Sequence, residues 1–156
     1  MSARTLIFTI NFVVLLGSCW LGFESLKLGF LSTAVSFVAA GLAVACVGAA
    51  AVLHSRFPKK HTEAADFPNL MTTGPYGYVR HPFYSTVIVL NYAVSFAVLS
   101  YYAIIASTLM LPLWWYLVKT EEMDLVNVWG QKYIDYKKNV PMLIPKLQRK
   151  RKTSKT

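Results

Sequence analysis

The sequence predicts an all-α integral membrane protein with four transmembrane helices, followed by short cytoplasmic C-terminal helices. Three observations predict this class. Of the 156 residues, 55% are hydrophobic, long stretches carry no charged side chain, and nearly all positive charges fall on one side of those stretches. A bilayer core about 30 Å thick needs about 20 apolar residues per helix. We therefore treat residues 1–156 as a single membrane domain.

The first two spans are predicted over residues 5–23 and 28–53, separated by a short polar turn. From residue 83 to residue 118 the chain has no charged residue, and one span needs only about 20 residues. This stretch is predicted to form a helical hairpin of two spans, 83–99 and 102–118, that turns near Ser100. Three aromatic residues near the end of the hairpin are expected in the interfacial belt; they are Trp114, Trp115 and Tyr116.

Small residues are frequent in the second span, where Gly41, Ala45 and Gly48 recur at helical spacing. Small side chains let helix backbones approach closely in lipid, where packing drives association. The pattern predicts a packing stripe within the bundle, with a dimer face as the alternative. It indicates no chemistry.

Charge decides the orientation of the spans. Of sixteen Lys and Arg residues, only Lys27 lies between the first two spans, and the others share the opposite side. The positive-inside rule then places both termini in the cytoplasm. The net charge of +9, and above all the basic tail 146–156, is expected to contact anionic lipid headgroups. We predict no nucleic-acid partner, because a basic tail beside membrane helices is typical of electrostatic anchoring. The oligomeric state and the cellular membrane stay open.

Two cytoplasmic elements flank the hairpin, over residues 67–84 and 119–145. The first is a loop rich in proline and glycine, residues that define or permit unusual backbone angles. The second is expected to contain a helix that ends at Gly130, since glycine commonly follows a helix C-terminus. A second short helix, from Gln131 to Lys138, places Tyr133 and Tyr136 on one face.

Ionisable and aromatic side chains gather at both ends of the hairpin. Because a helical hairpin brings its own ends together, these groups are expected to meet at the cytoplasmic interface, where ionisable groups are costly and usually functional. The structural alternative is that Arg80 and His81 pair with Glu121 or Glu122 and only close the base of the hairpin. The full set is Tyr76, Arg80, His81 and Tyr84 before the hairpin, and Glu121, Glu122 and Asp124 after it.

The segment from Gly74 to Tyr84, Gly-Pro-Tyr-x-Tyr-Val-Arg-His-Pro-x-Tyr, resembles the signature of the isoprenylcysteine carboxyl methyltransferase family. A second resemblance follows in the family's order. It consists of Glu121-Glu122-x-x-Leu125, then Gly130-x-x-Tyr133-x-x-Tyr136, then Val140-Pro141. The two motifs together cover about half of the chain. The resemblance implies an integral-membrane, phospholipid methyltransferase-like enzyme that uses S-adenosylmethionine and a lipophilic methyl acceptor from the bilayer.

The resemblance also implies roles for individual residues. Arg80 or His81 is expected to hold the cofactor carboxylate, and Glu121 to accept hydrogen bonds from its ammonium or ribose hydroxyls. Catalytic roles are predicted for Arg80 and Glu122. The predicted cofactor-binding residues are Tyr76, Arg80, His81, Pro82, Phe83, Tyr84 and Glu121. No metal is expected, because His54 and His61 lack matching Cys or carboxylate ligands.

The chain departs from the family pattern at Leu117, where the family carries an arginine that binds the acceptor's carboxylate. Phospholipid amines and small thiols therefore compete with prenylcysteine as predicted acceptors. Two other classes of function remain as alternatives. One is an oxidoreductase resembling sterol reductases, although this chain lacks the arginine-rich loop expected for a nicotinamide dinucleotide. The other is a membrane module without catalysis, in which the same residues form a structural cluster.

Overall fold

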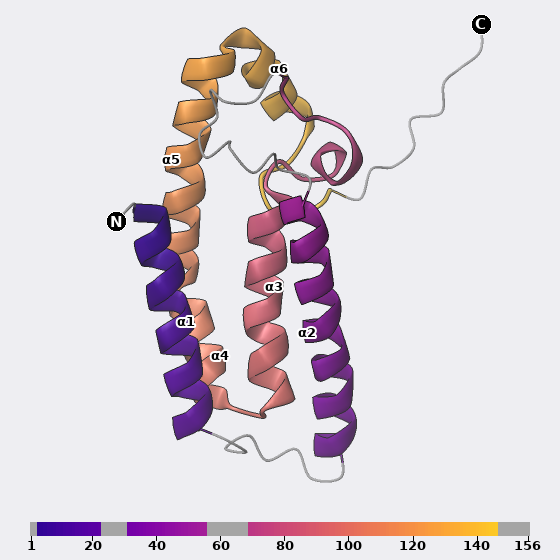
Figure 1. Cartoon of the computed structure of the whole chain (residues 1–156), viewed down its shortest axis with the longest axis vertical. Coiled ribbons are helices and arrows are strands. Elements are labelled where there is room, and N and C mark those ends of the chain that lie inside the picture. The colour runs from indigo at the N-terminus through magenta and orange to yellow at the C-terminus, as the bar shows by residue number, and fades with distance from the viewer. Residues whose placement is uncertain (1–2, 23–30, 56–68, 147–156) are drawn as a thin grey trace, which may run out of the picture.

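The protein is described from a computed structural model, which covers residues 3–22, 31–55 and 69–146. These residues form helices and connecting segments without a strand (Figure 1). The long helices are α1 (Ala3–Leu21), α2 (Ser32–Ser55), α3 (Pro82–Ala97), α4 (Tyr101–Leu109) and α5 (Leu111–Trp129). A 3-10 turn, Gly74–Gly77, precedes α3, and α6 (Gln131–Asn139) follows α5. The basic tail from residue 147 and the segment 56–68 lie outside the described residues.

Among the described residues, three segments are long and apolar enough to cross a membrane: Arg4–Leu21, Ser32–Leu53 and the combined α4–α5 stretch Tyr101–Trp129. This supports the predicted class of all-α membrane protein. The third predicted span, 83–99, corresponds to α3, which has 16 residues and is shorter than the roughly 20 that a bilayer core requires. Length and composition thus identify three of the four predicted spans.

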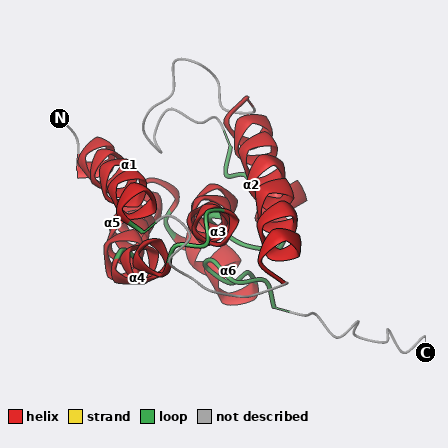
Figure 2. Cartoon of the chain, turned by 90° about the horizontal axis from the view of Figure 1, so that it is seen from below, coloured by secondary structure: helices red, strands yellow, loops and turns green. Residues whose placement is uncertain are grey.

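The helices form a bundle with α3 at its centre. Seen end-on, α2 lies on one side of α3, and α1, α4 and α5 lie on the other (Figure 2). Helix α5 extends past the N-terminal end of α1 and leads into α6, which lies near the start of α3 (Figure 1). The arrangement brings the residues before α3 to the same end of the bundle as the second half of α5.

The second half of the hairpin is interrupted once and then continues further than predicted. Helix α4 ends at Leu109 and α5 begins at Leu111, because Pro112 has no amide hydrogen to bond the preceding turn. From there α5 runs without a break to Trp129, so the predicted span and the helix after it are one element. Gly130, with φ of 52°, ends it as predicted.

The prediction of a packing stripe in the second span is wrong for the bundle. Helix α2 buries Ala39, Cys46 and Leu53, whereas Gly41 and Gly48 are exposed. A Cβ atom added at either glycine would meet no described atom within 4 Å. The helix therefore packs through a neighbouring face, where its buried residues recur every seven positions.

The core has an aromatic layer and a polar layer. Toward the start of α3, the buried residues Ile7, Tyr84, Met110, Trp114, Leu117 and Val118 form one cluster. In the middle of the bundle, Asn11 of α1 and Asn91 of α3 exchange two hydrogen bonds, of 3.3 and 2.7 Å. Because lipid offers no competing partner, such amide pairs fix helices against each other. This pair fixes α1 beside α3.

Candidate functional site

Backbone hydrogen bonds hold the loop before α3 against the C-terminal segment. The amide of Arg80 donates to the carbonyl of Pro141 at 2.8 Å, and that of His81 donates to Met142 at 3.1 Å. The Ser85 hydroxyl donates to the carbonyl of Leu143 at 2.7 Å. The two motif segments are thus in direct contact, although about 60 residues separate them in the sequence.

Arg80 and Glu122 form a buried ion pair at the centre of this contact. The Arg80 Nε and Nη2 atoms lie 2.7 and 2.5 Å from Glu122 Oε1. The remaining terminal nitrogen of Arg80 donates to the carbonyls of Lys137 and Val140 at the end of α6. The Lys137 ammonium lies 2.9 Å from Glu122 Oε2. Glu122 is 2% exposed, and the Arg80 and Lys137 cations balance its charge inside the protein, although its Oε2 atom has no hydrogen-bond partner among the described residues.

The site has two halves, and the tyrosines of α6 complete the half that is built around the Arg80–Glu122 pair. The Tyr136 hydroxyl donates to the carbonyl of Tyr76 at 2.5 Å, and the Tyr133 hydroxyl donates to Glu122 Oε1 at 3.4 Å. Burial raises the pKa of Tyr136 to about 12, although the charge of Arg80 acts in the opposite direction. Burial and the Glu122 carboxylate raise the pKa of Tyr133 as well. Both tyrosines are therefore protonated donors at neutral pH.

A second half of the site surrounds Tyr84, on the side of α3 that faces α1 and α5. The Tyr84 ring lies 5.9 Å from that of His81 and 6.1 Å from that of Trp114. Phe8 of α1 packs edge-on against Trp114 at 4.9 Å and lies 6.0 Å from Phe83. The Glu121 carboxylate adjoins Tyr84. Aromatic rings from three helices thus enclose the start of α3.

Three buried polar atoms in this second half lack a hydrogen-bond partner within the described part of the chain. They are His81 Nε2, Trp114 Nε1 and Glu121 Oε2. The His81 nitrogen lies 3.6 Å from Glu122 Oε1, just beyond hydrogen-bond range. A buried polar group without a partner costs about 1–3 kcal/mol, and native proteins rarely leave one unpaired. Three such atoms around one tyrosine are what a site for a polar ligand would present.

The structure brings most predicted site residues to one end of the bundle but divides them. Arg80 and Glu122, the predicted catalytic residues, bind each other. Glu121 faces α1 instead, with its Oε1 atom 3.8 Å from Arg4 Nη2. Asp124 is exposed. Of the remaining predicted residues, Tyr76 lies in the Arg80–Glu122 half, where its carbonyl accepts from Tyr136. His81, Phe83 and Tyr84 lie together in the second half, and Pro82 is buried at the start of α3.

Sequence reasoning missed three residues of the site. Arg4 counted only toward the charge asymmetry, and Lys137 only toward a short surface helix. Trp114 was expected in the interfacial belt but is fully buried, whereas Trp115 and Tyr116 are exposed. Its position seven residues before Glu121 places both on one face of α5 and is the signal that would have identified it.

An apolar groove of about 800 Å³ runs between α2, α3 and the C-terminal segment. It adjoins the site, because its lining residues Pro82 and Ser85 are the sequence neighbours of His81 and Tyr84. On α2 the lining includes Ala45 and Ala49. Of the predicted stripe of small residues, Ala45 therefore borders a groove, whereas Gly41 and Gly48 are not among its lining residues.

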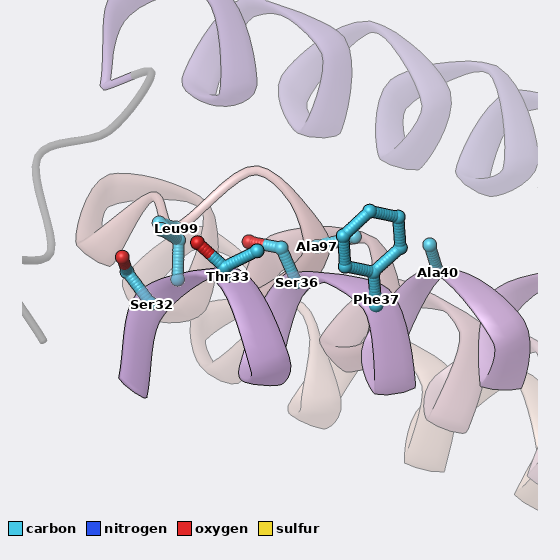
Figure 3. A pocket seen from close by; sticks show the side chains of 7 residues that line it. All are labelled: Ser32, Thr33, Ser36, Phe37, Ala40, Ala97 and Leu99. Carbon is cyan, nitrogen blue, oxygen red and sulfur yellow. The ribbon is translucent and has the colours of Figure 1, made fainter. Parts of the chain in front are cut away.

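A smaller hollow, of about 350 Å³, lies at the other end of α3 (Figure 3). Its polar side chains are Ser32, Thr33 and Ser36, and Leu99 is among its apolar lining residues. None of its described lining residues is ionisable, so it is separate from the predicted chemistry. The histidines considered for a metal site, His54 and His61, have side chains outside the described part of the chain.

Comparison with known proteins gives one family and several relatives. The model of the phospholipid methyltransferase family matches residues 18–132, more than half of the chain, including both motif segments as far as Lys132. No solved structure matches.

Curated relatives match part of the chain. A methanethiol S-methyltransferase of Crocosphaera subtropica is 33% identical over 84 residues, which are 48% of this chain and 29% of that protein. A protein-S-isoprenylcysteine O-methyltransferase of Mus musculus is 31% identical over 87 residues, which are 54% of this chain and 30% of that protein. The match thus spans about three-tenths of each relative.

Proposed function

Because the chain belongs to the phospholipid methyltransferase family, we propose that it transfers a methyl group from S-adenosylmethionine to a lipophilic acceptor that enters from the bilayer. The observation that carries this proposal is the set of partnerless polar atoms around Tyr84: His81 Nε2, Trp114 Nε1 and Glu121 Oε2. Glu121 suits an ammonium or ribose hydroxyl, and the surrounding rings suit a purine and a sulfonium.

When bound, S-adenosylmethionine supplies an electrophilic methyl group on its sulfonium. Transfer of that methyl group is an in-line displacement, so the protein's task is alignment and exclusion of water. We assign cofactor contacts to Tyr76, His81, Pro82, Phe83, Tyr84 and Glu121. Arg80 and Glu122 act as positioning residues, because their ion pair and the Arg80 bonds to α6 hold the backbone at His81.

Titration of S-adenosylmethionine against the purified full-length chain in detergent or nanodiscs tests the proposal. We expect saturable binding that His81→Ala and Glu121→Ala each weaken by about ten-fold or more, the loss expected for one charge-assisted hydrogen bond. Asp124→Asn is the matched control, because it neutralises an exposed carboxylate of the same helix. Absence of binding by the wild-type chain would leave the Arg80–Glu122 cluster as a structural element only.

The acceptor is proposed from the groove and from Leu117. The groove is almost wholly apolar in its lining, which suits an alkyl chain. Leu117 is 4% exposed and packs in the core, so position 117 offers no cation for a carboxylate. The named relatives act on methanethiol and on isoprenylcysteine. For this chain we propose a lipophilic acceptor whose reacting group is a thiol or an amine in preference to a carboxylate.

Mass spectrometry of products decides the acceptor. The purified chain is incubated with labelled S-adenosylmethionine and, separately, with phosphatidylethanolamine, an alkyl thiol or a prenylcysteine analogue. We expect label in the amine or the thiol. Label in the prenylcysteine ester alone would overturn the choice of acceptor while retaining the methyltransferase.

We also propose that α3 is a fourth span and that both chain termini are cytoplasmic. At about 1.5 Å per residue, α3 reaches about 24 Å, which is sufficient where the lipid thins locally. In a background without Cys19 and Cys46, an impermeant thiol reagent should label Ser25→Cys and Lys138→Cys from opposite sides. Labelling of both from one side would exclude this topology.

A further inference from the structure

Arg4 and Glu121 connect α1 to α5 at the edge of the Tyr84 half of the site. Arg4 Nη2 lies 3.8 Å from Glu121 Oε1, and the two side chains are 46% and 25% exposed. At this separation the contact is an ion pair without a hydrogen bond. The pair therefore leaves the donors of Arg4 and the buried Oε2 atom of Glu121 available to a third group.

The other arginine at this end of the bundle is already occupied. Arg80 directs its nitrogens to Glu122 and to the carbonyls of Lys137 and Val140. A carboxylate placed near Arg80 would also meet the negative charge of Glu122. Among the described residues, Arg4 is therefore the arginine beside Glu121 that could bind an anion without breaking a buried ion pair.

We propose that Arg4 and Glu121 together bind the amino-acid end of S-adenosylmethionine, with Arg4 holding its carboxylate and Glu121 its ammonium. This inference rests on the proposed function. The carboxylate and the ammonium are borne by one carbon atom, so the ligand presents opposite charges side by side. Arg4 and Glu121 present the complementary charges side by side, and both kinds of contact are charge-assisted hydrogen bonds.

The looseness of the pair favours this role. An exposed ion pair contributes little to stability, so its separation by a ligand costs little. The ligand then replaces one weak contact with two stronger ones, and a guanidinium binds a carboxylate through two parallel N–H groups. Arg4 lies at the N-terminal end of α1, and the amide pair Asn11–Asn91 holds that helix beside α3.

Three ligands separate this inference from the proposed function. S-adenosylmethionine has both charges, decarboxylated S-adenosylmethionine lacks the carboxylate, and methylthioadenosine lacks the whole amino-acid end. Each is titrated against the full-length wild-type chain, Arg4→Ala and Arg4→Lys, with thermal unfolding as a check on folding. We expect Arg4→Ala to weaken S-adenosylmethionine by about ten-fold or more and to leave decarboxylated S-adenosylmethionine unchanged. Arg4→Lys should restore part of the loss.

Lys119→Ala is the matched control. It removes one positive charge two residues from Glu121, but the Lys119 ammonium lies over the Trp115 ring at 5.4 Å. We expect no selective loss of S-adenosylmethionine in this variant. Equal weakening of all three ligands by Arg4→Ala, or no weakening, would overturn the inference and leave the proposed function intact. No binding of any ligand by the wild-type chain would overturn both.

Discussion

Glu121 and Glu122 are consecutive residues of α5, yet their carboxylates have opposite surroundings. Glu122 is 2% exposed and lies within 3.6 Å of Arg80, Lys137 and His81. Each carboxylate has a buried Oε2 atom without a hydrogen-bond partner among the described residues. Glu122 Oε2, however, lies 2.9 Å from the Lys137 ammonium, whereas Glu121 has one loose ion-pair contact, 3.8 Å from its Oε1 atom to Arg4. Successive helical residues point about 100° apart, so these consecutive carboxylates face different neighbours: Glu122 faces several close cations, and Glu121 faces one distant cation. The contrast supports the proposal that Glu122 stabilises the site and that Glu121 binds a ligand.

The two carboxylates also belong to different sets of elements. The partners of Glu122 come from the loop before α3 and from α6, whereas the surroundings of Glu121 come from α1 and α3. Helix α1 supplies no ion-pair partner of Glu122 among the described residues. Each half can therefore be perturbed while the other serves as its internal reference.

The largest expected effect comes from Glu122→Gln, which leaves Arg80 without its buried counter-charge. Breaking a buried ion pair in this way costs about 3–5 kcal/mol, or roughly 10 °C in the apparent unfolding temperature. Glu121→Gln should cost no more than about 1 kcal/mol, because its pair with Arg4 is partly exposed. Thermal unfolding of the purified chain in detergent measures both variants.

Binding of S-adenosylmethionine should reverse that order. Measured well below the unfolding temperature, Glu121→Gln should lose more affinity than Glu122→Gln, since only Glu121 is assigned to the ligand. Equal destabilisation of the chain by the two variants would contradict the assignment of a stabilising role to Glu122 and a ligand-binding role to Glu121.

A smaller effect is expected from Asn11→Ala, which tests whether α1 controls the Glu121 half alone. The variant leaves the Asn91 amide in the middle of the bundle without its partner, at a cost of about 1 kcal/mol. Because α1 also carries Arg4 and Phe8, we expect a several-fold loss of affinity for S-adenosylmethionine. Calorimetry gives the affinity, and thermal unfolding gives the stability.

Thr9→Ala is the control for this variant, because the Thr9 hydroxyl bonds only the Thr5 carbonyl of its own helix. The double variant Asn11→Ala with Asn91→Ala should recover some stability, since neither amide is then left alone. Lower stability with unchanged affinity would mean that the position of α1 does not matter to the ligand.

The length of the apolar stretches predicted the helical class, and Gly130 predicted where α5 ends and α6 begins. The hairpin predicted that the two motif segments meet. The length of α3 could not, because an uncharged stretch does not show where a helix ends. The prediction for Trp114 was wrong. Composition alone favours an interfacial position for an aromatic residue, whereas packing against Phe8 and Tyr84 places this ring in the core.

The division between Glu121 and Glu122 depends on tertiary contacts that no local pattern contains. The motif gives two adjacent carboxylates, and their partners come from positions 4, 80 and 137. Which carboxylate meets which cation follows from the rotation of α5 relative to α1 and α6. That rotation depends on packing throughout the core. Sequence reasoning could therefore name Glu121 and Glu122 as the two possible partners of Arg80, but it could not choose between them.

The smallest expected effect is a pH dependence on the Glu122 side. Burial raises the pKa of Tyr136 to about 12, above its ordinary value of about 10. The folded state therefore retains this proton to higher pH than the unfolded state does, so its contribution to stability is complete below pH 10 and is lost as pH rises toward 12.

Tyr136→Phe, which removes the hydrogen bond to the Tyr76 carbonyl, should cost about 1 kcal/mol at neutral pH. The difference from wild type should shrink between pH 10 and 12, whereas Tyr78→Phe, at a side chain that is 71% exposed, should show no such trend. A difference that stays constant to pH 12 would mean that the Tyr136 hydroxyl does not hold the loop before α3. The Arg80–Glu122 pair alone would then hold this half of the site together.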